Sequence, residues 1–139
     1  MKHVFGLALI VGSMLGFVSG QALAHHSFAA AYDTSAEGAI TITGRIVQVR
    51  LTNPHSFFFL DVEDEESGEV VRWSFEAGTP SGMLRNGYSP EVIKEGDVVT
   101  IAGFRAHDPS KPNGMLSELT TADGTVFGMF GPREGPGAR

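Results

Sequence analysis

The chain contains no cysteine among its 139 residues. This absence excludes a lipid-anchored cysteine, disulfide bonds, thiolate metal sites and a cysteine nucleophile. Any metal site must therefore be built from nitrogen and oxygen ligands. The chain also lacks a long apolar run after its first 24 residues, so we expect no membrane insertion once those residues are removed.

Basic residues are few: lysine and arginine total 10, against 16 aspartate and glutamate residues, and the formal net charge is −6. Nucleic-acid binding draws most of its affinity from neutralising phosphates, which an acidic chain does poorly. The same balance disfavours binding to an anionic membrane surface. The composition therefore predicts no nucleic-acid partner.

The first 24 residues have the layout of a secretory signal peptide. Lys2 precedes an apolar run at residues 4–18, and the small residues Ala22 and Ala24 follow it. The run is too short for a membrane span, which needs about 20 apolar residues. The pattern predicts cleavage after Ala24 and a periplasmic or secreted protein.

Residues 25–130 have the length of one domain, with an amino-terminal extension at residues 25–38. The tail at residues 131–139 is rich in glycine and proline, and we expect it to be disordered.

Alternating apolar residues and turn signals predict an all-β domain. The expected strands cover residues 40–51, 56–63, 71–75, 97–106, 116–121 and 125–130. The apolar alternation changes phase near Ile46 and Val47, which predicts a bulge or a strong bend in the first strand. Thr79 and Gly87 bound a short helix at residues 80–86. This order predicts a small OB-like barrel of five to six strands, with a small β-sandwich as the alternative.

Several short motifs run through the sequence outside the signal peptide. They are His25-His26-Ser27-Phe28-Ala29, Tyr32-Asp33, Gly44, Thr52-Asn53-Pro54-His55, Asp61-Val62, Trp73, Leu84-Arg85 and Gly96-Asp97. In these residues the chain resembles a family of exported bacterial proteins catalogued as domain of unknown function 6152. The resemblance covers nearly the whole mature chain. It implies export and one small domain, without an assigned activity.

The histidines are the residues that point to a particular chemistry. Cleavage after Ala24 makes His25 the first residue, so its amino group and imidazole can chelate a metal together. His26 follows directly, and His55 lies in the Asn-Pro-His turn after the first strand. The amine-plus-imidazole pair resembles, in its first residue only, the histidine brace of some exported copper proteins. We therefore predict a metal site at His25, His26 and His55, with copper as the metal and zinc as the alternative.

A turn at residues 35–38 would let the mature amino terminus run back antiparallel to the first strand and approach His55. Asp33 is a candidate for holding a ligand imidazole in place. Adjacent histidines at a new terminus also occur simply as polar residues of a frayed end, so the metal site remains one interpretation.

The rival interpretation is a metal-free binding module for a protein or envelope ligand. Phe57 and Phe59 point away from the expected core and would form its contact face together with the His55 loop. No spacing of serine, histidine and aspartate selects a catalytic triad, and no glycine-rich phosphate loop is present. The sequence therefore favours a binding role over an enzymatic one.

Overall fold

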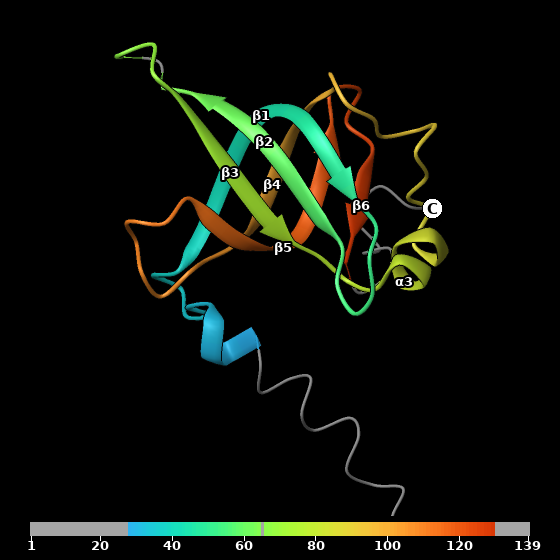
Figure 1. Cartoon of the computed structure of the whole chain (residues 1–139), viewed down its shortest axis with the longest axis horizontal. Helices are drawn as coiled ribbons and strands as arrows, with labels where there is room; N and C mark the ends of the chain where they lie inside the picture. The colour runs from blue at the N-terminus through green and yellow to red at the C-terminus, as the bar shows by residue number, and fades with distance from the viewer. Residues whose placement is uncertain (1–27, 65, 130–139) are drawn as a thin grey trace, which may run out of the picture. The chain divides into compact units, whose positions relative to one another are not determined.

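The structure is a computed structural model that describes residues 28–64 and 66–129 (Figure 1). The expected signal peptide, the two adjacent histidines and the tail at residues 131–139 lie outside the described residues. Residues 28–31 are helical and belong to a separate unit of the chain. The account below concerns the unit that begins at Tyr32.

Six strands and one short helix make up this unit. They are β1 (Ala39–Arg50), β2 (Phe57–Glu63), β3 (Val70–Glu76), α3 (Pro80–Arg85), β4 (Val98–Arg105), β5 (Asn113–Thr121) and β6 (Val126–Gly128). The helix begins where the sequence predicts, because the Thr79 hydroxyl accepts a hydrogen bond from Gly82 N–H (3.1 Å) and Pro80 occupies the first helical position.

The strands close into a ring in the order β1–β2–β3–β5–β4 and back to β1. Strand β1 serves both halves of the ring: Ala39–Arg45 pairs with β4, and Arg45–Arg50 pairs with β2. The register with β2 shifts between Ile46 and Gln48, which confirms the expected bulge. This single sheet, which the pairing of β3 with β5 closes, confirms the prediction of an all-β domain with a barrel-like ring of strands (Figure 1).

The inner face of the ring holds the core. Its fully buried members include Ile46, Phe58, Leu60, Phe75, Ile101 and Leu116. In β2 the buried residues Phe58 and Leu60 alternate with the partly exposed Phe57 and Phe59, as the period of two requires. Burying each such side chain stabilises the fold by about 1.5–3 kcal/mol.

Closure of the ring requires two glycines where strands approach closely. A Cβ at Gly103 would lie 1.9 Å from the Met115 carbonyl oxygen, at the register shift between β4 and β5. A Cβ at Gly114 would lie 2.9 Å from Phe104 O and 3.0 Å from the Phe75 ring. A larger residue at either position must push these strands apart.

We expect Gly103→Ala to lower the free energy of unfolding by about 1–3 kcal/mol, because the added methyl collides with backbone that cannot move aside cheaply. Gly78→Ala is the matched control, since its Cβ would meet nothing closer than 3.6 Å. Denaturant unfolding of both variants measures the difference. Equal stabilities would show that the ring tolerates widening at Gly103.

Candidate functional site

His55 lies in the loop between β1 and β2, and this loop is fixed to the end of β3. The Thr52 hydroxyl donates a hydrogen bond to the His55 carbonyl (3.0 Å). Ser56 N–H donates to Gly78 O (3.0 Å), and Ser56 O accepts from Ala77 N–H (2.8 Å). The backbone of His55 is therefore held beside the chain that leaves β3.

Glu76 is the last residue of β3 and lies opposite Phe57 of β2 and Met115 of β5. Its Oε1 atom pairs with Nδ1 of His55. The exposed fractions of the two side chains are 17% for Glu76 and 25% for His55. The contact is therefore largely shielded from water, and solvent screens it less than it screens a surface ion pair.

Tyr32 contacts the other oxygen of the same carboxylate. Its hydroxyl donates a hydrogen bond to Glu76 Oε2 (2.6 Å), and only 5% of Tyr32 is exposed. Burial, and then the hydrogen bond and negative charge of Glu76, raise the pKa of the Tyr32 hydroxyl far above its ordinary value. Tyr32 is consequently a phenol at any physiological pH and acts as a hydrogen-bond donor.

The end of β4 holds Tyr32 in position. Tyr32 forms an antiparallel bridge with Ala106, and Asp33 N–H donates to Arg105 O (3.0 Å). Arg105 N–H in turn donates to Gly38 O (2.8 Å), so both ends of the turn are attached to one residue of β4. The expected turn is therefore present, but the chain before it meets β4 and does not run back along β1.

Asp33, the candidate for orienting a ligand, is used within this turn. Its Oδ1 accepts hydrogen bonds from the Ser35 hydroxyl (2.6 Å) and the Ser35 N–H (3.1 Å). These bonds hold the pKa of the Asp33 carboxyl below its usual value. The carboxylate that orients His55 is instead Glu76.

Together, Tyr32, Glu76 and His55 form what we call the Tyr32–Glu76–His55 network. One carboxylate accepts from two donors, one at each oxygen. A carboxylate partner suits a protonated Nδ1. The network therefore holds one edge of the His55 ring against Glu76.

Of the three predicted metal ligands, only His55 lies among the described residues. His25 and His26 lie outside the described residues, and His55 takes part in the network. Within residues 28–64 and 66–129, no group of three or more histidine, aspartate or glutamate side chains is placed to hold a metal ion. The sequence analysis missed Glu76 as a site residue, because nothing in the local sequence sets it apart from other acidic residues at strand ends.

Phe57 and Phe59 lie on the outer face of β2, as the sequence predicts, and both are partly exposed. Their ring centroids are 6.4 Å apart with planes 28° from parallel. The Arg50 guanidinium lies 5.3 Å from the centre of the Phe59 ring, within the range of a cation–π contact. This aromatic face adjoins the network, since Phe57 is the register partner of Glu76.

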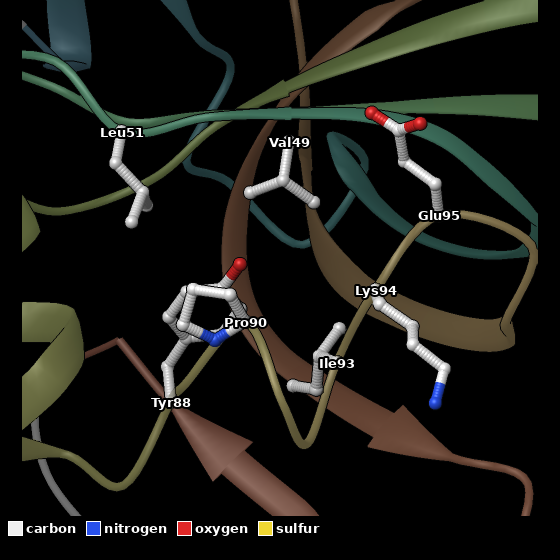
Figure 2. Close-up of a pocket in the computed structure, with 7 residues that line it drawn as sticks. All are labelled: Val49, Leu51, Tyr88, Pro90, Ile93, Lys94 and Glu95. Atoms are coloured by element: carbon white, nitrogen blue, oxygen red, sulfur yellow. The ribbon is translucent and has the colours of Figure 1, made fainter.

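A separate hollow of about 330 Å³ opens between the second half of β1 and the chain before β4 (Figure 2). Its lining residues are Val49, Leu51, Tyr88, Pro90, Ile93, Lys94 and Glu95. Figure 2 shows Val49 of β1 and Leu51, the residue directly after β1, pointing toward the loop that carries Tyr88 and Ile93. The hollow is mainly apolar and shares no residue with the network.

Across the part of the chain that the structure describes, no helix has the length and apolar character to cross a membrane. No curated protein matches the chain. The family model that matches is described as a family of unknown function (DUF6152), and the match covers residues 14–115. These residues are most of the chain and include the whole Tyr32–Glu76–His55 network, and the protein therefore belongs to this family of unknown function.

Proposed function

We propose that the protein is exported and binds one copper ion between its mature amino terminus and His55, with zinc as the alternative metal. In this proposal the signal peptide is removed after Ala24. The ligands are the amino group and imidazole of His25 and the imidazoles of His26 and His55. In this proposal the protein carries or buffers the metal.

The pairing of His55 Nδ1 with Glu76 is the observation that carries the proposal. Histidines that bind metals almost always donate the other ring N–H to a carboxylate or a carbonyl, which fixes the tautomer and increases the basicity of the ligating nitrogen. His55 has this partner, so Nε2 is the atom through which it would bind the metal.

The donor set favours copper over zinc. An amine and up to three imidazoles give an all-nitrogen set, which suits the tetragonal geometry of Cu(II). The same imidazoles arranged as a tetrahedron would suit Zn(II), which is why zinc remains the alternative.

Copper titration of the exported protein, with its terminus verified as His25, tests the proposal directly. We expect one Cu(II) per chain and an electron paramagnetic resonance (EPR) signal typical of a nitrogen-rich type 2 site. One alanine added before His25 moves the amino group away from the imidazole. We expect this addition to weaken binding by at least the 10- to 100-fold that is typical of losing a supporting partner. Weak binding at several sites, unchanged by the added residue, would contradict the proposal.

His55→Ala should also weaken copper binding by about 10- to 100-fold or more, because it removes a direct ligand. His107→Ala is the matched control, since His107 is an exposed histidine on the loop after β4. We expect the control to keep the wild-type dissociation constant. Full affinity in His55→Ala would remove His55 from the site.

The aromatic face supports the second candidate, a metal-free module that binds a protein or envelope ligand. Phe57 and Phe59 are partly exposed and stacked, with Arg50 beside them. Partly exposed aromatic residues with a neighbouring arginine are common in binding surfaces. Such a module would be indifferent to a residue added before His25 but sensitive to Phe57→Ala.

A further inference from the structure

We infer that Tyr32 is a positioning residue for His55, and that it acts through the Glu76 carboxylate. In its metal-binding consequence this inference rests on the proposed function.

The carboxylate geometry is the first argument. Glu76 accepts from Tyr32 at Oε2 (2.6 Å) and pairs with His55 at Oε1, so each donor has an oxygen of its own. A glutamate side chain otherwise turns about three torsions, and its last torsion is broad. The bond from Tyr32 holds one oxygen in place, which leaves the other oxygen aimed at His55. Without that bond, the Glu76 carboxylate can turn, and its contact with His55 Nδ1 is no longer held in one geometry.

The rigidity of Tyr32 is the second argument. The residue is 5% exposed, and it is bridged to Ala106 while its neighbour Asp33 is bonded to Arg105. Ala106 N–H in turn donates to Asn113 O (3.0 Å), and Asn113 is the register partner of Ser74 in β3. Tyr32 and Glu76 are therefore joined through the backbones of β4, β5 and β3. Because the backbone of Tyr32 is held rigidly, its hydroxyl can fix the position of the Glu76 carboxylate. A hydroxyl on a mobile residue would move together with the carboxylate.

The chemistry of the phenol is the third argument. A hydroxyl donor satisfies the carboxylate without neutralising its charge, so Glu76 stays an anionic acceptor for His55. A lysine or arginine at position 32 would compete with the imidazole for the same charge. The hydroxyl thus orients the carboxylate and leaves its charge to act on the histidine.

Tyr32→Phe tests this role, with Tyr88→Phe as the matched control. The chain has only two tyrosines, both buried, and the Tyr88 ring packs edge-on against Phe58 at 5.5 Å. Each variant removes one hydroxyl and keeps the ring. For Tyr32→Phe we expect copper affinity to fall about 10- to 100-fold and the EPR spectrum to show fewer coordinated nitrogens. For Tyr88→Phe we expect the wild-type values.

Two measurements on the metal-free protein separate this inference from the proposed function. The ¹⁵N NMR shifts of the His55 ring at fixed pH should show the Nδ1-protonated tautomer in the wild type and a mixture in Tyr32→Phe. A double-mutant cycle of Tyr32→Phe and His55→Ala should be non-additive by roughly 2- to 10-fold in the folding equilibrium constant. Tyr88→Phe should change neither result.

The outcomes are distinct. Absence of copper binding in the wild type overturns the proposed function, while the metal-free measurements still decide the role of Tyr32. Copper binding that is equally tight in the wild type and in Tyr32→Phe, with unchanged His55 shifts and an additive cycle, overturns the positioning role alone.

Glu76→Asp gives an independent route to the same conclusion, and it decides the question if Tyr32→Phe does not fold. It keeps the charge but is one methylene shorter, so its carboxylate cannot serve both donors in their present positions. Wild-type His55 shifts in this variant would likewise overturn the inference.

Discussion

The parallel pairing of β3 with β5 is the constraint on which the rest of the structure depends. It converts a meander of antiparallel strands into a closed ring, and it is the only parallel contact among the strands described at residues 28–64 and 66–129. The pairing is short and relies on Gly114, which lies close to Phe104 and Phe75. Without it, β3 would be an exposed edge and Glu76 would have no fixed position relative to β4.

The same closure creates the network. Glu76 stands on β3 where that strand meets β5, and Tyr32 reaches it from the far end of β4. His55 comes from a third direction, on a loop fastened to the chain beyond β3. Three segments far apart in the sequence thus meet at one carboxylate. A small displacement of β3 would break both of its hydrogen-bonded contacts together, so the fold and the orientation of His55 are linked.

The local sequence was sufficient to predict the strands, the bulge near Ile46 and the capped start of α3, because each depends on neighbours within a few residues. Glu76 and Tyr32 could not be paired in this way. Their contact depends on the register of β3 against β5 and on the bridge of Tyr32 with Ala106, both of which are long-range. The sequence singles out His55, but its partner Glu76 could not be predicted for the same reason.

A buried polar network is a costly way to gain stability alone, because apolar packing of the same volume often stabilises as much or more. A carboxylate with two donors instead fixes the orientation of side chains. Tyr32 limits the rotation of the Glu76 carboxylate, and Glu76 limits the rotation of the His55 ring. The hydrogen bonds of Thr52 and Ser56 already hold the loop between β1 and β2 in place. Holding this loop does not require the His55 imidazole to have a fixed orientation. A ligand that binds through one ring nitrogen does require it. The oriented ring of this quarter-exposed histidine is therefore the feature on which the proposed copper site depends.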